Sequence, residues 1–139
     1  MDKNFEEAIK FVLKWEGGLV EDKNDPGGVT KYGISQKSYP YEDIRGMTLG
    51  RAKEIYYQNY WLKSECDKTP APMNLILFDT SVNCGRSRAK KILLTSLGWE
   101  DYLFKRIEFY AGLKTAKYYL RGWINRVVDL YKLIKENKL

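Results

Sequence analysis

Residues 16–34 constrain the fold of this chain more than any other stretch, because a helix must end where they begin. The preceding segment is apolar at helical spacing: Phe5, Ala8, Ile9, Val12 and Leu13. This pattern predicts an amphipathic helix, which we expect to begin near Asn4 as N-cap with Glu7 as its reciprocal partner. Gly17-Gly18 ends the helix and leaves Glu16 on its last turn. A carboxyl group there faces the negative end of the helix dipole, which favours the protonated form that a proton donor requires.

The segment after this helix end is rich in turn residues. The sequence Asp25-Pro26-Gly27-Gly28 is a strong turn signal, since Pro sets one φ angle and Gly permits positive ones. Polar and apolar residues then alternate from Thr30 to Ile34, which predicts one short extended strand of a hairpin. Asp25 follows Glu16 by nine positions and Thr30 follows it by fourteen. We expect the helix end and the hairpin to bring these three side chains to one cleft.

These residues resemble the signature of glycoside hydrolase family 108, whose members are N-acetylmuramidases and lysozyme-like endolysins. The spacing of Glu, Asp and Thr is also similar to that of phage-type lysozymes, with one residue fewer between Asp and Thr. The resemblance continues through segments that match the family in order: Tyr56, Tyr60-Trp61, Cys66-Asp67, the run from Phe78 to Gly85, and the run from Gly122 to Arg126. It therefore covers nearly the whole chain.

The expected fold is one all-α, lysozyme-like domain over residues 1–139, with six to seven helices and a small β-hairpin after the first helix. We expect later helices near 48–63, 72–84, 87–98, 100–112 and 123–136, with Thr48 and Ser87 as N-caps. The segment from Leu75 to Val82 is apolar around most of its helix, which predicts a central, buried position. Residues 1–85 carry the motif and this central helix, and residues 86–139 form a basic helical half.

The resemblance implies that Glu16 is the general acid of a glycosidase, with Asp25 as the second carboxylate and Thr30 holding the attacking water. The implied reaction cleaves the β-1,4 bond between N-acetylmuramic acid and N-acetylglucosamine in peptidoglycan. A water-holding threonine favours inversion, because inverting enzymes keep their carboxyl groups far enough apart to admit water. Glu21 and Asp22 compete with Asp25 for the second role, and we rank both lower.

Four further residues are candidate substrate contacts: Gly28, Tyr32, Tyr60 and Asn83. Tyr32 and Tyr60 suit a packed core with their hydroxyl groups at its edge equally well. Asn83 shares a helix face with Asp79, four residues earlier. The alternative role for this pair is structural, because buried polar groups must be hydrogen-bonded and these two would hold neighbouring backbone.

Composition excludes several other chemistries. The chain has no histidine, which argues against a zinc site or a histidine-based triad, and we expect neither a metal nor a cofactor. Cys66 and Cys84 are too few for a disulfide scaffold, so we expect free thiols in a reducing cytoplasm. No stretch approaches the roughly 20 apolar residues of a membrane span, and the N-terminus carries no signal-peptide pattern. We expect a monomer made in the cytoplasm that reaches the cell wall or periplasm through a holin or another export route.

Charge is unevenly distributed along the chain. Residues 1–85 carry 11 Lys and Arg against 13 Asp and Glu, whereas residues 86–139 carry 13 against 5. The basic half favours a polyanionic partner, and we expect anionic cell-wall polymers alongside the peptidoglycan strand. Two alternatives remain: a non-catalytic wall-binding or secretion-accessory protein, against which an intact Glu16 and Asp25 argue, and a nucleic-acid-binding domain using the basic segment 85–91. We rank nucleic acid last, although basic charge alone does not discriminate between these polyanions.

Overall fold

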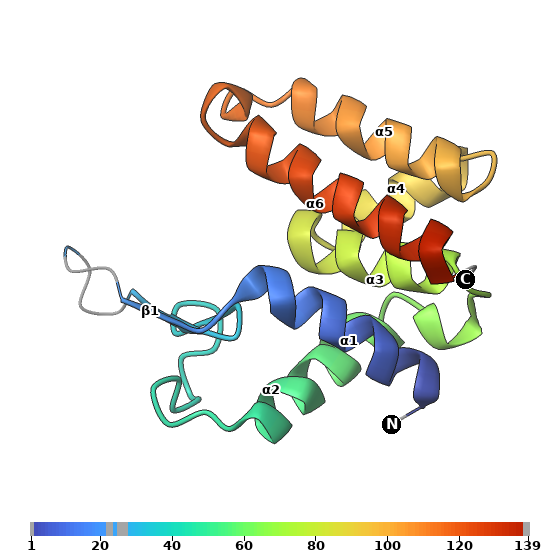
Figure 1. Ribbon diagram of the computed structural model, residues 1–139. Coiled ribbons are helices and arrows are strands. Elements are labelled where there is room, and N and C mark those ends of the chain that lie inside the picture. Colours follow the sequence, from blue (N-terminus) through green and yellow to red (C-terminus); the bar gives the residue numbers. More distant parts are fainter. Residues whose placement is uncertain (1, 22–23, 25–27, 138–139) are drawn as a thin grey trace.

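The computed structural model describes residues 2–21, 24 and 28–137 (Figure 1). The described part contains six α-helices and a small antiparallel sheet after the first helix, which confirms the predicted mainly helical fold. The elements in chain order are α1 (Lys3–Glu16), β1 (Leu19–Glu21), β2 (Val29–Lys31), β3 (Ile34–Ser35), α2 (Leu49–Tyr56), the π-helix η1 (Tyr57–Leu62), the 3₁₀-helix η2 (Cys66–Lys68), α3 (Met73–Cys84), α4 (Arg86–Thr95), α5 (Trp99–Ala111) and α6 (Ala116–Asn137).

Helix α3 is the centre of the fold, as its apolar sequence predicts. Every residue from 74 to 81 is buried, because α1, α4 and α5 all pack against this helix. Phe78 of α3 meets Phe5 of α1 and Trp61 of η1 edge to face, with ring centroids 5.6 and 5.4 Å apart. Edge-to-face aromatic pairs add to the free energy gained by burying the rings. This packing fixes α1, and therefore its last residue, relative to α3.

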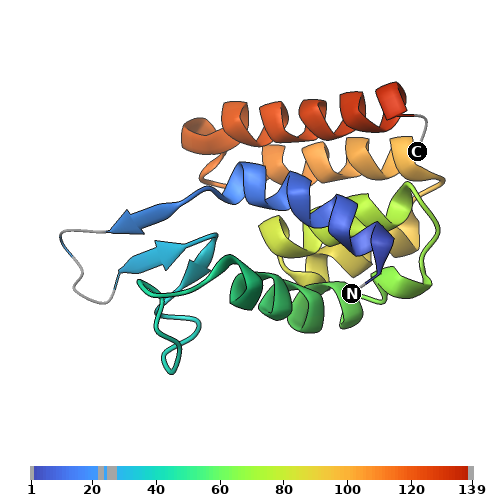
Figure 2. The ribbon, with the colours of Figure 1, turned by 60° about the horizontal axis from the view of Figure 1, so that its bottom comes forward.

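The sheet differs from the single hairpin that the alternating sequence predicts. Its order is β1-β2-β3, with Val20 opposite Thr30 and Thr30 opposite Ser35. The expected strand from Thr30 to Ile34 is broken by a two-residue turn at Tyr32 and Gly33, whose φ angles are +53° and +80°. Positive φ at both central positions is the geometry that closes tight hairpins, and alternation of residue types does not reveal it. The sheet extends away from the helices beyond the end of α1 (Figure 2).

The start of α1 also differs from the prediction. The helix begins at Lys3, and Asp2 rather than Asn4 is its N-cap, accepting a hydrogen bond from the Phe5 backbone N–H at 2.7 Å. Both residue types are good caps, so the sequence alone did not distinguish them. Asp2 has a second partner far along the chain, since the Trp61 indole N–H donates to it at 3.1 Å. That tertiary contact favours the earlier start.

Two later helices have boundaries that the sequence pattern did not predict. Gly85, not Ser87, precedes α4, and no side chain caps that helix. Helix α6 begins at Ala116, seven residues before the predicted start at Trp123. Its first turns are mostly exposed and lack the periodic apolar residues that mark the rest of the helix. The N-cap predicted at Thr48 is confirmed, because its hydroxyl accepts from the Arg51 backbone N–H at 3.1 Å.

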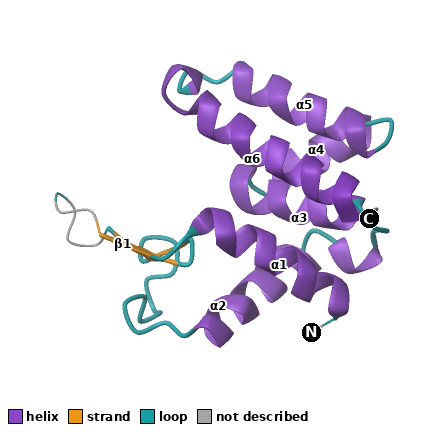
Figure 3. Cartoon of the chain, viewed as in Figure 1, coloured by secondary structure: helices purple, strands orange, loops and turns teal. Residues whose placement is uncertain are grey.

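Helices α1 and α6 run in opposite directions, with α3 between the α1–α2 part and the α4–α6 part (Figures 1 and 3). This arrangement brings the end of α1 to the middle of α6, although the two are far apart in sequence. Within the described residues, no helix combines the length and the apolar character needed to cross a membrane.

Candidate active site

Glu16 is the last residue of α1, as predicted. Gly17 ends the helix with a φ of +73° and donates its backbone N–H to the Leu13 carbonyl at 3.0 Å. The Glu16 side chain is 23% exposed, so its carboxyl group is partly enclosed yet reachable from solvent. A carboxyl group in this position can exchange a proton with a bound molecule.

Glu16 is the first member of a series of buried or partly buried ion pairs in which negative and positive side chains alternate. We call this series the ion-pair chain, and its members are Glu16, Arg126, Asp79 and Arg106. Arg126 of α6 donates through Nη1 to Glu16 Oε1 at 2.9 Å and through Nη2 to Asp79 Oδ1 at 2.7 Å. On the far side, Arg106 Nη2 of α5 lies 2.8 Å from Asp79 Oδ2. Each of the four groups comes from a different helix, so the chain ties α1, α3, α5 and α6 together at the site.

Both arginines are charged in spite of their burial. Burial disfavours a charged guanidinium and is the largest single influence on each arginine. Asp79 and the neighbouring groups together still raise the pKa of Arg106 and of Arg126 above the ordinary value, with Glu16 adding to the effect on Arg126. Arg106 is completely buried and also binds Tyr110 OH through Nε at 2.9 Å. Arg126 is therefore a cation beside Glu16, held in position by Asp79 of α3 and through it by Arg106 of α5.

The tight turn of the sheet packs directly against Glu16. The Tyr56 hydroxyl of α2 donates to the Tyr32 carbonyl at 2.6 Å and so anchors the turn. Burial raises the pKa of the Tyr56 phenol, and the nearby Glu16 charge raises it further, so the hydroxyl stays a donor. Gly33 approaches closely enough that a Cβ atom there would lie 2.9 Å from Glu16 Oε2.

We expect Gly33→Ala to damage the site without unfolding the helices. A non-glycine residue at this φ costs about 1–3 kcal/mol, and the new methyl group would displace Glu16 or the Tyr56 hydroxyl. Thermal unfolding should show a lower midpoint, and any activity that depends on the Glu16 carboxyl group should fall at least tenfold, because small displacements of reacting groups are costly. Gly18→Ala is the matched control, since no atom lies within 4 Å of its added Cβ. Equal midpoints for the two variants would show that the turn does not support Glu16.

The other candidate residues lie in different surroundings. Thr30 is the middle residue of β2 and half-buried, and its hydroxyl makes no hydrogen bond to a described residue. Gly28 directly precedes that strand. Tyr60 is half-buried, with its ring 5.6 Å from the Tyr56 ring. Asn83 faces α5 instead, where its amide oxygen accepts from the Tyr110 hydroxyl. Asp25 and its rival Asp22 lie outside the described residues.

Asp79 and Arg126 are site residues that the sequence did not place beside Glu16. Asp79 was expected to hold neighbouring backbone, but its partners are the two buried arginines. Arg126 was noted only as part of the run that matches the family pattern. A separation of 110 residues from Glu16 leaves no local signal for the contact. The one available hint was an aspartate within an otherwise apolar helix, which requires a partner of opposite charge.

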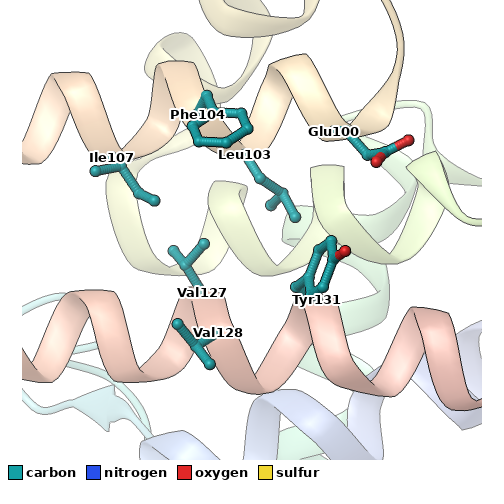
Figure 4. A pocket seen from close by; sticks show the side chains of 7 residues that line it. All are labelled: Glu100, Leu103, Phe104, Ile107, Val127, Val128 and Tyr131. Carbon is teal, nitrogen blue, oxygen red and sulfur yellow. The ribbon is translucent and has the colours of Figure 1, made fainter.

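The hollow between α5 and α6 has a different character. It encloses about 440 Å³ and is lined by three apolar side chains of α5 and by two valines and a tyrosine of α6 (Figure 4). Its single carboxylate, Glu100, lies at one end and is 3.8 Å from Lys135. Among the described residues, no group of His, Cys, Asp and Glu is arranged to hold a metal ion. We therefore place the candidate active site at Glu16, whose carboxyl group is partly exposed and paired with Arg126.

Comparison with known proteins identifies the class of the protein. The family model described as Glycosyl hydrolase 108 matches residues 9–85, which is more than half of the chain and includes the Glu16 segment. The chain belongs to this family of glycoside hydrolases. Among solved structures it is similar to SagA of Brucella abortus, with 25% identity, a TM-score of 0.78 and 91% of each chain covered. No curated protein matches the chain.

Proposed function

We propose that this protein is an N-acetylmuramidase, which hydrolyses the β-1,4 bond between N-acetylmuramic acid and N-acetylglucosamine in peptidoglycan. The observation that carries the proposal is the partly exposed Glu16 carboxyl group, fixed between Arg126 and the tight turn in a chain of this family. Glycoside hydrolysis commonly uses one carboxylic acid that protonates the leaving oxygen and one carboxylate on the other side of the sugar.

In the proposed mechanism Glu16 protonates the glycosidic oxygen through Oε2. Arg126 binds Oε1, whereas Oε2 has no hydrogen-bond partner among the described residues. This arrangement orients the carboxyl group and leaves one oxygen for the substrate. A fixed proton donor contributes about 10²–10⁴-fold to such a reaction.

Asp25 is the second carboxylate of the proposal, and Thr30 holds the attacking water. The hydroxyl group of Thr30 is free of other hydrogen bonds to described residues, which suits that role. A water between the two carboxyl groups implies inversion, for which they stand roughly 6.5–9.5 Å apart, against about 5–5.5 Å in retaining enzymes. Asp25 lies outside the described residues and falls between β1 and β2 in the sequence.

Digestion of purified sacculi tests the proposal. New reducing ends should appear on muramic acid, and NMR of the first product should show the α-anomer. Reducing ends on glucosamine would assign the cleavage to the other glycosidic bond, and freed amino groups would assign it to a peptide or amide bond. A β-anomer as first product would replace inversion by retention.

We also propose that the enzyme acts at the cell wall or in the periplasm after release from the cytoplasm, as a monomer, with its basic half near anionic wall polymers. Two cations of that half, Arg106 and Arg126, are excluded from this contact because they are buried in the ion-pair chain. The remaining cations supply the long-range attraction, which added salt should weaken.

A further inference from the structure

A polar cavity lies between the segment after β3, the π-helix η1 and the start of α4. It encloses about 390 Å³ and is lined by the polar side chains of Tyr39, Asn59 and Tyr60 and by two cations, Lys63 and Arg86. A neighbouring cavity of about 500 Å³ shares both cations and adds a third, Lys90. Lys63 and Arg86 therefore stand where the two hollows join.

These two cations have no counter-charge of their own. Within the described part of the chain, neither Lys63 nor Arg86 has a hydrogen-bond or ion-pair partner, and no carboxylate lines the first cavity. Glu65, the one carboxylate among the described residues that line the second cavity, lies 3.7 Å from Lys68. By contrast, the exposed Arg51 pairs with both Glu42 and Glu54. Two uncompensated cations at the edge of a cavity suit a ligand with negative charge.

Two tyrosines link the first cavity to the candidate active site. The Tyr60 ring, which lines it, contacts the Tyr56 ring, and the Tyr56 hydroxyl anchors the turn against Glu16. The Tyr60 phenol is close enough to Glu16 and to Arg86 to feel the charge of both residues. Burial raises its pKa, the Glu16 charge raises it further, and the Arg86 charge lowers it. A molecule bound at Glu16 that extends past Tyr60 would reach Lys63 and Arg86.

We propose that Lys63 and Arg86 bind the carboxylates of the stem peptide carried by the muramic acid residue of the bound glycan strand. This inference rests on the proposed function and adds the part of the peptidoglycan substrate, other than the sugars, that the protein binds. The sugars of a glycan strand are uncharged, whereas the stem peptide branches from the lactyl group of muramic acid and carries free carboxylates. A guanidinium pairs with a carboxylate in two parallel hydrogen bonds, and the flexible Lys63 adds a second point of attraction.

The test compares peptide-bearing glycan strands with the same strands stripped of peptide by an amidase. The variant is the double substitution Lys63→Gln and Arg86→Gln. We expect its KM for peptide-bearing strands to rise about tenfold with kcat nearly unchanged, because two exposed charge contacts together are worth about a factor of ten. For stripped strands the KM should stay within about twofold of the parent, because the amidase removes the carboxylates of the peptide and leaves only the lactyl carboxylate, which lies next to the sugar ring.

Lys114→Gln with Arg121→Gln is the matched control, because it removes the same two charges from exposed positions outside both cavities. An equal rise in KM on both substrates, or a rise no larger than that of the control, would overturn the inference. Calorimetric binding of both kinds of strand separates this inference from the proposed function. If the parent binds but cleaves neither strand, the muramidase assignment fails, while a peptide-dependent affinity lost in the variant would still support the subsite.

Discussion

Glu16→Gln is expected to lower the rate of peptidoglycan hydrolysis by about 10²–10⁴-fold, the usual contribution of a general acid. The amide has the shape of the carboxyl group but does not supply the proton. Its oxygen can still accept from Arg126, and Arg126 keeps its partner Asp79. Because the replaced group is partly exposed, we expect the free energy of unfolding to change by no more than about 1 kcal/mol. Release of reducing ends and thermal unfolding measure the two quantities.

Three further variants provide a control for Glu16→Gln and identify the second carboxylate. Glu7→Gln removes the same charge from an exposed site on α1 and should leave activity unchanged. Asp25→Asn tests the second carboxylate and should also abolish hydrolysis. If Asp25→Asn is active while Glu21→Gln is not, the second carboxylate is Glu21. A Glu16→Gln rate within a few-fold of the parent would remove Glu16 from the acid role.

Asp79→Asn should have the largest effect on stability. Asp79 is fully buried and is the shared counter-charge of Arg106 and Arg126. An amide leaves a fully buried guanidinium without a negative partner, and breaking a buried ion pair in this way costs about 3–5 kcal/mol. For a chain of this length that cost corresponds to a fall of roughly 10 °C or more in Tm. Denaturant unfolding followed by circular dichroism measures it.

The control for this prediction is Asp67→Asn, an exposed aspartate with no ion pair among the described residues, which should change stability by about 0.5 kcal/mol or less. A second variant separates charge from packing. Asp79→Leu combined with Arg106→Leu removes one of the two stranded cations and should be more stable than Asp79→Leu alone. If Asp79→Asn unfolds within about 1 kcal/mol of the parent, the ion-pair chain does not hold the helices together.

The ion-pair chain also links stability to the site. Glu16 is positioned by Arg126, which is itself held by Asp79 and through it by Arg106. Loss of Asp79 should therefore lower activity even at temperatures where the variant stays folded, because a freed Arg126 no longer fixes the Glu16 carboxyl group. A loss of activity in the folded Asp79 variant would show that Asp79 positions Glu16 through Arg126 and does not only stabilise the fold.

Local sequence predicted the elements whose causes are local. The end of α1 followed from Gly17-Gly18, the start of α2 from Thr48, and the central place of α3 from its apolar surface. Where local causes competed, the prediction was wrong. Asp2 and Asn4, two positions apart, could each cap α1, and alternation in the sheet concealed the turn at Tyr32 and Gly33. A turn of positive φ leaves little trace in residue type except the glycine itself.

By itself, the sequence determined that this is a mainly helical chain of family 108 with Glu16 at the end of its first helix. Both conclusions depend on residues close together in the chain, where spacing and type carry the information. Only the tertiary structure decided what surrounds that glutamate. The pairing of Glu16 with Arg126, and of both arginines with Asp79, joins residues 27 to 110 positions apart. Opposite charges meet across such distances because the packing of four helices encloses them together, and a buried charge must then find its partner there.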